Sequence, residues 1–194
     1  NIKKNVYYVG NLQLELLKQC CLEYNNEDIL RIHNLEKNNF ILLTIHREYN
    51  TNKESLSKLF KDLNKLKKKI IFPIHPRTKN TIKEFNINVP SNIILIKPVN
   101  YLNITILERY CEFIITDSGG IQPEAWFLRK KCIVMRTETE WIEPLKNNNN
   151  ILYDYKTNIF DFINNFLKKK INNIDNKIDI NVSENILKYI LLNN

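Results

Sequence analysis

Short apolar runs rich in β-branched residues alternate along this chain with longer segments whose apolar residues recur at helical spacing. The short runs predict strands at Phe40–Ile45, Lys69–Ile74, Asn92–Ile96, Glu112–Thr116, Lys131–Met135 and Ile151–Tyr153. The segments between them predict helices at Asn52–Lys67, Lys79–Phe85, Leu102–Tyr110, Ile121–Leu128 and Glu140–Lys146. This alternation is typical of an α/β protein, and it predicts a doubly wound parallel sheet of about six strands.

Further elements are predicted at the two ends of the chain. Val6–Val9 predicts a brief strand, followed by a helix over Gly10–Leu22. Ile159–Ile171 and Ile186–Leu192 predict amphipathic helices that pack back on the body. A chain of 194 residues suits one sizeable core. We divide it into a connecting segment with the first strand and helix (residues 1–22), a ligand-binding domain (23–171) and a C-terminal helix that packs back (172–194).

The composition is that of a folded globular protein, with 43% hydrophobic and 26% charged residues. The net charge is +8, but the lysines fall in helix-like runs such as Lys67–Lys69 and Lys168–Lys170, which are typical of solvated helix ends. Asn, Lys and Ile are overused along the whole length, as in a background bias. The charge therefore gives little support for a nucleic-acid partner, although a basic surface favours an anionic ligand.

Cysteine spacing and hydropathy narrow the class of protein further. Cys20, Cys21, Cys111 and Cys132 show no C-x-x-C pair and no zinc-finger histidine pattern, which predicts reduced, mostly packed thiols and no metal site. The apolar runs are far shorter than the roughly 20 residues of a membrane span. No charged-then-apolar leader opens the sequence, so a cytoplasmic location is expected.

Two of the three glycines are adjacent, in a turn between a predicted strand and a predicted helix. Gly119 and Gly120 lie at the carboxyl edge of the sheet, where open α/β sheets bind ligands. Glycine lets a phosphate approach the backbone amides at a helix start. Ser118 could cap the helix or donate to a phosphate oxygen. The turn therefore indicates a phosphate-containing ligand.

Glu124, one turn into the predicted helix, extends this interpretation to a nucleotide. A carboxylate repels a diphosphate but accepts hydrogen bonds from two ribose hydroxyls. Pro123 is compatible with the first helical turn, because its missing donor is not used there. The alternative is a plain turn in which Ser118 caps the helix and the dipole favours Glu124.

Two histidines are predicted at the same edge. His46 and Arg47 follow the first long strand, and a His–Arg pair suits an anion because Arg supplies a planar fork of donors and His a titrating proton. His75 precedes Pro76, which keeps it out of helical geometry at the end of the next strand. The alternative for both histidines is a structural role. With Ser118, three strand ends then face one crevice.

Together these segments resemble the non-hydrolysing UDP-N-acetylglucosamine (UDP-GlcNAc) 2-epimerases. The matching residues are Thr44, His46, Arg47 and Asn50; His75 and Pro76; Pro98, Tyr101 and Leu102; Thr116 to Gln122, Glu124 and Ala125; and Arg136, Thr139, Glu140, Trp141 and Glu143. The resemblance covers Gly10 to Leu152, and the Asp-Ser-Gly-Gly turn favours this branch over the hydrolysing epimerases. Two positions depart from the family pattern: Pro123 replaces a usual Glu, and Ile104 a frequent Phe.

The resemblance implies one Rossmann-like half of a GT-B-type enzyme whose two domains enclose the active site. It assigns the diphosphate of UDP to Ser118, Gly119 and Gly120, the ribose to Glu124 and the uracil to the backbone at Ile104. It also places Arg136 in the substrate site and His46, as the catalytic residue, on the diphosphate near the sugar. Arg47 and His75 match a regulatory UDP-GlcNAc site of bacterial members. Neither a cofactor nor a metal is expected.

The reaction implied by this resemblance inverts C2 of the GlcNAc unit during the synthesis of cell-surface polysaccharide. UDP is eliminated anti across C1 and C2 and is re-added to the 2-acetamidoglucal, which gives UDP-ManNAc. The acid and base carboxylates of the family belong to an N-terminal Rossmann-like domain, so this chain alone is not expected to epimerise. Its expected partners are UDP-GlcNAc or UDP, that missing domain and a second copy in a homodimer, but no nucleic acid and no membrane.

Three other functions stay open. The chain could be the donor-binding half of a glycosyltransferase, which uses the same fold and a similar ribose-binding Glu. It could be a UDP-sugar-binding remnant without catalysis. A basic nucleic-acid-binding module is a third possibility, although the sequence lacks the aromatic platforms and motifs of such modules.

Overall fold

The computed structural model describes residues 6–172 and 181–192. By their contacts they form two compact units: Asn26–Asn173, and Asn1–Asn25 with Ile174–Asn194. We describe each unit by itself. The predicted segment 172–194 lies partly outside the described residues.

The unit Asn26–Asn173 contains a six-stranded, entirely parallel sheet. Its strands are β1 (Phe40–Thr44), β2 (Lys69–Pro73), β3 (Ile93–Ile96), β4 (Phe113–Thr116), β5 (Lys131–Val134) and β6 (Asn150–Leu152). Each coincides with a predicted strand to within a residue at either end, and the α/β doubly wound sheet is confirmed.

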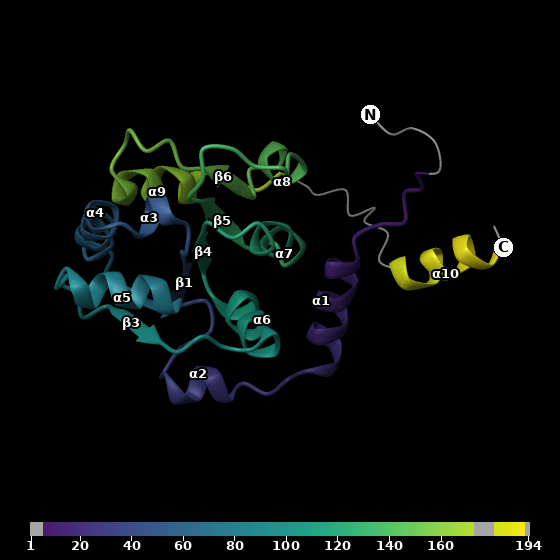
Figure 1. The fold of residues 1–194 in the computed structure, drawn as a ribbon, viewed down its shortest axis with the longest axis horizontal. Coiled ribbons are helices and arrows are strands. Elements are labelled where there is room, and N and C mark those ends of the chain that lie inside the picture. The colour runs from purple at the N-terminus through teal and green to yellow at the C-terminus, as the bar shows by residue number, and fades with distance from the viewer. Residues whose placement is uncertain (1–5, 173–180, 193–194) are drawn as a thin grey trace. The chain divides into compact units, whose positions relative to one another are not determined.

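Helices cover both faces of this sheet. They are α2 (Asp28–Ile32), α3 (Glu48–Thr51), α4 (Lys53–Leu63), α5 (Pro76–Glu84), α6 (Tyr101–Tyr110), α7 (Ile121–Phe127), α8 (Glu143–Lys146) and α9 (Ile159–Lys168). In Figure 1, α4, α5 and α9 lie on one side of the sheet, and α6 and α7 on the other. The short helices α2 and α3 were not predicted, because one turn carries too few residues to show a period.

The strand order β3-β2-β1-β4-β5-β6 sets the position of a ligand site. From β1 the chain adds β2 and β3 in one direction; it then crosses back to β4 and adds β5 and β6 in the other direction. The direction reverses between β1 and β4. A doubly wound sheet forms its ligand crevice at the carboxyl ends of the strands at this reversal.

Side chains on both faces of the strands are buried, as a covered parallel sheet requires. Ile41, Leu43 and Ile115 join the core with Phe60 of α4 and Phe166 of α9. The alternate residues of the central strands, such as Leu42 and Ile114, are buried as well. The two central strands are therefore held rigidly, and the residues that follow them are placed accurately.

Asparagine supplies many of the signals that begin and end the helices. Its side chain accepts a backbone N–H at the N-caps of α4, α6 and α9, at Asn52, Asn100 and Asn158. Left-handed backbone is adopted by Asn34, Asn38, Asn86 and Asn148. Glycine usually fills such positions, but the whole chain has three glycines, and Asn is the next best residue there. The asparagine excess therefore has a structural use.

The other unit contains α1 (Leu12–Glu23) and α10 (Val182–Leu192) among its described residues. The carboxylate of Glu15 on α1 accepts hydrogen bonds from the backbone and hydroxyl of Ser183 on α10 (2.9 and 2.8 Å). The predicted strand at Val6–Val9 is wrong: this segment pairs with no strand in the described part of the chain, and the Val9 carbonyl accepts instead from the Asn185 side chain (3.4 Å). An isolated strand leaves its backbone groups unpaired, so the apolar pattern alone was insufficient.

The four cysteines are thiols and form no disulfide with one another, and Cys20, Cys111 and Cys132 are buried. No helix within residues 6–172 and 181–192 is long and apolar enough to cross a membrane.

Candidate functional site

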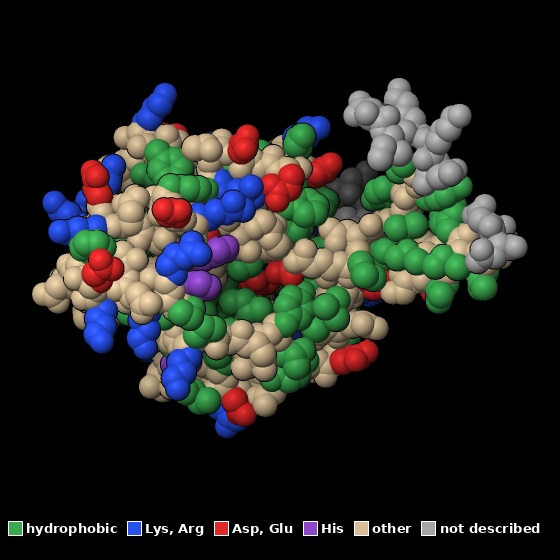
Figure 2. Space-filling view, viewed as in Figure 1, with side chains coloured by type: hydrophobic (Ala, Val, Ile, Leu, Met, Phe, Trp, Pro, Cys, Tyr) green, Lys and Arg blue, Asp and Glu red, His purple; other side chains and the backbone are tan. Residues whose placement is uncertain are grey.

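A cavity of about 380 Å³ opens at the carboxyl ends of β1 and β2. It is lined by Thr44, Ile45, His46, Pro73, His75, Pro98, Val99, Tyr101 and Ile104. Figure 2 shows histidine side chains at the edge of a hollow on this face, with Lys or Arg side chains beside them. The cavity therefore brings together three of the predicted site residues: His46, His75 and Ile104.

The rings of His46 and His75 lie side by side, with centroids 6.4 Å apart. His75 is the N-cap of α5, and its Nδ1 accepts a hydrogen bond from the Arg77 backbone N–H (3.2 Å). In the neutral ring the proton is then on Nε2, which leaves a donor for a ligand. The Nδ1 atom of His46 lies 3.1 Å from an Asp117 carboxylate oxygen, so Nε2 is the nitrogen of this ring that is left for a ligand.

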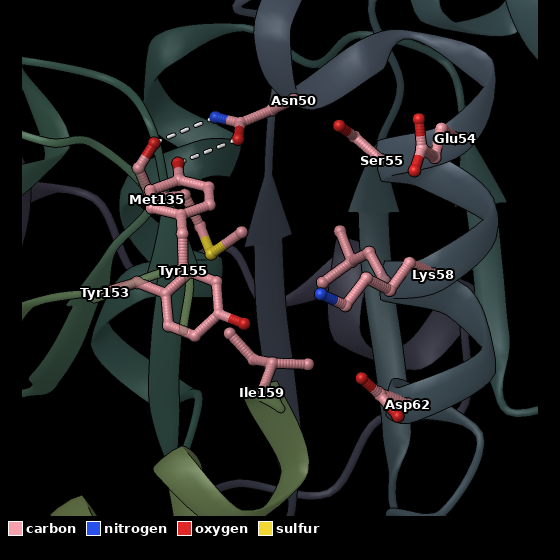
Figure 3. Close-up of a pocket in the computed structure, with 10 residues that line it drawn as sticks. Asn50, Glu54, Ser55, Lys58, Asp62, Met135, Tyr153, Tyr155 and Ile159 are labelled. Carbon is pink, nitrogen blue, oxygen red and sulfur yellow. Dashed lines mark hydrogen bonds between the residues drawn. The ribbon is translucent and has the colours of Figure 1, made fainter. Parts of the chain in front are cut away.

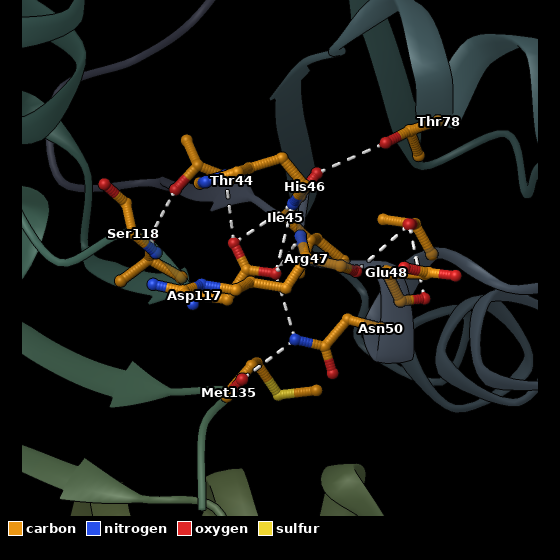
Figure 4. A network of polar contacts seen from close by, with 12 residues as sticks. Thr44, Ile45, His46, Arg47, Glu48, Asn50, Thr78, Asp117, Ser118 and Met135 are labelled. Atoms are coloured by element: carbon orange, nitrogen blue, oxygen red, sulfur yellow. Dashed lines mark hydrogen bonds and ion pairs between the residues drawn. The ribbon is translucent and has the colours of Figure 1, made fainter. Parts of the chain in front are cut away.

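Asp117 holds the first strand end in place, a role that sequence reasoning missed. Its carboxylate is fully buried and accepts hydrogen bonds from the backbone N–H groups of His46 (3.0 Å) and Arg47 (2.9 Å). It also accepts from Asn50 Nδ2 (2.9 Å), which in turn donates to the carbonyl of Met135 (2.8 Å). Figure 4 shows the backbone after β1 and the Asn50 amide of α3 meeting at this carboxylate, with Asn50 extending the network to Met135 after β5.

The same contacts set the charge of Asp117. Burial by itself would raise the pKa of this carboxyl, but hydrogen bonds from His46, from Asn50 and from the Arg47 backbone outweigh it and hold the pKa below its usual value. Asp117 therefore stays ionised beside His46. The available signal was an Asp directly after a buried strand whose neighbour ends in His.

The glycine turn follows β4 at the reversal of the sheet. The Ser118 backbone N–H donates to Thr116 Oγ1 (3.0 Å), and the Ser118 carbonyl accepts from Gln122 Nε2 (3.1 Å). α7 begins at Ile121 with Gly120 as its N-cap and no side-chain capping bond. The alternative in which Ser118 caps this helix is therefore wrong, and in the described part of the chain no contact occupies its hydroxyl.

The φ angle of Gly119 lies outside the left-handed region, so what glycine provides here is open space above the backbone. A Cβ at this position would lie 2.9 Å from Glu140 Oε1 and 3.7 Å from Arg136 Nη1. Arg136 pairs with Glu140 through the same nitrogen (3.0 Å to Oε2). The corner above Gly119 thus holds a guanidinium and the mobile end of an exposed glutamate, and the guanidinium suits an anion there.

Glu124 lies deeper, with 3% of its surface exposed. Its Oε1 accepts a hydrogen bond from the hydroxyl of Tyr101 (2.7 Å), and Tyr101 lines the cavity. Tyr101 entered the sequence argument only as a matching position, and the structure gives it a contact with the predicted ribose acceptor. The lining of the cavity does not include Glu124, Ser118, the glycines or Arg136.

Arg47 contacts the site through its backbone. Its backbone N–H is bound by Asp117, but its side chain is exposed and is not among the residues that line the cavity with His46. Arg47 is the N-cap of α3 and already belongs to the turn into that helix. The alternation of side-chain directions along β1 therefore does not extend to it.

The sequence model of the family described as UDP-N-acetylglucosamine 2-epimerase matches residues 1–191. The chain belongs to the UDP-N-acetylglucosamine 2-epimerase family. A UDP-N-acetylglucosamine 2-epimerase of Methanococcus maripaludis is 42% identical over 161 residues, which are 77% of this chain and 44% of that protein. One of Methanocaldococcus jannaschii is 37% identical over 183 residues, which are 88% of this chain and 50% of that protein.

Solved structures of epimerases agree with the fold. The crystal structure of the M. jannaschii UDP-GlcNAc 2-epimerase in complex with UDP-GlcNAc and UDP has a TM-score of 0.83 at 35% identity and covers 100% of this chain and 56% of its own. The Neisseria meningitidis UDP-GlcNAc 2-epimerase bound to UDP-GlcNAc has a TM-score of 0.78 at 27% identity and covers 97% of this chain and 56% of its own. The chain thus spans about half the length of the relatives it matches.

A second cavity of about 300 Å³ lies behind the Asp117 contacts of this epimerase-family chain. It is lined by Asn50, Glu54, Ser55, Lys58, Leu59, Asp62, Met135, Tyr153, Tyr155 and Ile159. Figure 3 shows the hydroxyl of Tyr155 donating to Asn50 Oδ1 (2.9 Å), the amide that also donates to Met135 and Asp117. Its wall therefore supports the site from behind.

Proposed function

We propose that this chain is the UDP-binding half of a non-hydrolysing UDP-GlcNAc 2-epimerase, the enzyme that converts UDP-GlcNAc to UDP-ManNAc. The observation that carries the proposal is the contact of His46 with Asp117, the residue directly before the Ser118–Gly120 turn, at the ends of β1 and β4 where the sheet reverses. Family membership supports it, because two relatives in this family are described as complexes with UDP-GlcNAc.

The proposed contacts follow from the chemistry of each group. Ser118, Gly119, Gly120 and Arg136 bind the diphosphate, since hydroxyl, amide and guanidinium donors suit an anion. Glu124 accepts the ribose hydroxyls, and the uracil meets the backbone at Ile104 in the cavity. Arg47 and His75 are proposed to bind a regulatory UDP-GlcNAc. The His75 ring lies beside His46, and its Nε2 can donate to this ligand because its Nδ1 accepts from the Arg77 backbone.

In the proposed reaction the C2 proton is removed while the C1–O bond to UDP breaks, which leaves 2-acetamidoglucal and UDP. UDP then adds back to C1 as a proton arrives at C2 on the other face. Negative charge develops on the leaving diphosphate, so donors fixed beside it lower the barrier. We assign that task to His46, kept oriented by Asp117, and to the Ser118–Gly120 turn.

The acid and base carboxylates are proposed to come from an N-terminal Rossmann-like domain, because the chain spans about half the length of its relatives. The whole enzyme would then be of GT-B type, with the cavity facing that domain, and could form a homodimer. A cytoplasmic location and a role in supplying cell-surface polysaccharide belong to the same proposal.

UDP is expected to raise the melting temperature of the 194-residue chain, because it binds only the folded state. The shift is expected to disappear in a variant that combines Ser118→Ala with Glu124→Gln, since the diphosphate and ribose contacts are both lost. Differential scanning fluorimetry with millimolar UDP measures it. The matched control is Ser57→Ala with Glu84→Gln, which changes the same residue types on exposed helical surface and leaves the shift intact. Wild-type protein whose melting temperature does not respond to UDP would contradict the proposal.

Gly119→Ala tests the diphosphate contact with the smallest possible change. The added methyl group meets the movable end of Glu140, so the free energy of unfolding is expected to change by less than about 1 kcal/mol. UDP affinity is expected to fall about tenfold, because the methyl group occupies the space of a phosphate oxygen. Calorimetric titration with UDP and with uridine separates the diphosphate contact from the nucleoside contacts. Uridine lacks the diphosphate, so its affinity is expected to stay unchanged. Equal losses for both ligands would place the diphosphate elsewhere.

A further inference from the structure

Glu108 is a fully buried acid that the proposed reaction does not use. It lies in α6, its exposed fraction is 0%, and within the described residues no donor reaches either carboxyl oxygen. Burying an ionised carboxylate without a donor is strongly unfavourable. Its state therefore requires an explanation.

The charge that acts on Glu108 is the carboxyl of Glu124, the proposed ribose acceptor. Tyr101, two turns before Glu108 on the same face of α6, donates to that carboxyl and ties α6 to it. Two ionised carboxylates are both acceptors, so neither satisfies the other and their charges repel. If one acid keeps its proton, it becomes a donor to the other, and the unpaired oxygens and the repulsion are resolved together. The proton belongs on Glu108, because Glu124 already accepts from the Tyr101 hydroxyl at 2.7 Å.

The surroundings of Glu108 favour the neutral acid. Burial first, and then the charge of Glu124, raise the pKa of Glu108 well above its usual value. Burial likewise raises the pKa of the nearby Cys111 and Cys132 thiols, so both stay uncharged.

No described cation pairs with Glu108. The ammonium group of Lys130 donates to the carbonyl of Cys111 and to Asn38, and it forms no ion pair with Glu108. On α2, which packs against α6, Asp28 and Arg31 pair with each other at the surface. Within the described residues no Lys, Arg or His side chain lies in ion-pair range of Glu108.

We propose that Glu108 keeps its proton at neutral pH and donates it in a hydrogen bond to Glu124, which fixes that carboxylate for the ribose hydroxyls. Glu108 is thus a positioning residue that acts through Glu124. The ribose role rests on the proposed function, whereas the shared proton does not.

The first experiment follows the stability of Glu108→Gln against pH without ligand. An acid whose folded pKa is raised stabilises the protein fully below its unfolded pKa near 4.5 and loses that stabilisation as the pH rises toward the folded pKa. The folding equilibrium constant of the wild type is therefore expected to fall, relative to Glu108→Gln, by up to about tenfold per pH unit above pH 4.5. Exposed Glu84→Gln is the control and should run parallel to the wild type. Parallel curves for Glu108→Gln would overturn the shared proton.

The second experiment compares UDP with 2′,3′-dideoxyuridine diphosphate, which lacks the ribose hydroxyls. Glu108→Gln keeps a donor, so its UDP affinity at pH 7 is expected to stay within about threefold of the wild type. Glu108→Leu removes the donor, and its UDP affinity is expected to fall about tenfold. Affinity for the dideoxy ligand should be equal in all three proteins, because Glu124 then has nothing to bind.

The outcomes separate the two claims. An equal loss for both ligands in Glu108→Leu, or no loss for UDP, would overturn the positioning role. A wild type that binds neither ligand would end both the ribose role and the proposed UDP site, while the pH series without ligand would still decide the shared proton. The full proposal is supported if Glu108→Leu binds UDP more weakly than the wild type but binds the dideoxy ligand equally well.

Discussion

Asp117→Ala is expected to lower the free energy of unfolding by about 4 kcal/mol at pH 7. Three donors lose their acceptor at once: the backbone N–H groups of His46 and Arg47 and one bond of the Asn50 amide. The two backbone N–H groups bind a fully buried carboxylate, so removing that carboxylate leaves both groups unsatisfied at the end of a central strand. Urea denaturation followed by far-UV circular dichroism measures the change.

The pH dependence distinguishes this charge from simple packing. Because the pKa of Asp117 is held below its usual 3.8, the stabilisation is present above that value and is lost as the pH falls through the folded pKa. The difference between wild type and Asp117→Ala should therefore shrink in acid. Glu48→Ala, at an exposed carboxyl on α3, is the control and should change stability by less than about 0.5 kcal/mol. A loss below about 1 kcal/mol, or one independent of pH, would mean that the carboxylate does not hold the strand end.

The sheet was predictable from sequence because its strands are buried on both faces. Runs such as Phe113–Thr116 then read as continuous apolar stretches between helical segments, and their order along the chain left few topologies. The misprediction at Val6–Val9 has the opposite cause: an apolar run becomes a strand only where a neighbour pairs with its backbone. Pairing is a tertiary property, so the local pattern cannot supply it.

The site was predictable as far as strand ends determine it. His46 and His75 follow adjacent strands, and parallel strands bring their carboxyl ends to one edge, so the two rings meet at 6.4 Å. Contacts that depend on side-chain direction were not predictable. The Arg47 side chain leaves the cavity because the turn into α3 begins at that residue, and Asp117 turns inward to the backbone of a strand that is 70 residues away in sequence.

Buried acids are a second class that sequence reasoning misses. Glu108 lies in a predicted helix among apolar residues, where a single charge reads as an exposed position. Only the packing of α6 and α7 against the sheet brings it to Glu124. Tyr101 is similar, since its hydroxyl has a functional contact only through the fold.

His46→Asn is expected to reduce epimerase turnover about 100-fold in the two-domain enzyme. The proposed role of the His46 imidazole is to stabilise the diphosphate as it leaves C1, and removing one such donor raises the barrier more than it weakens ground-state binding. UDP affinity of the chain alone should therefore fall less than tenfold. Turnover is measured as UDP-ManNAc formed from UDP-GlcNAc after coexpression with the cognate N-terminal domain.

The third histidine of the chain supplies the matched control. His33 lies at the end of α2, outside the cavity, so His33→Asn should leave turnover and UDP affinity unchanged. Turnover of His46→Asn within about threefold of the wild type would remove this residue from the chemistry. Deprotonation at C2 requires a base, which the proposal places on the other domain. The isolated chain should therefore form no UDP-ManNAc. Activity in that sample would show that the base lies within these 194 residues.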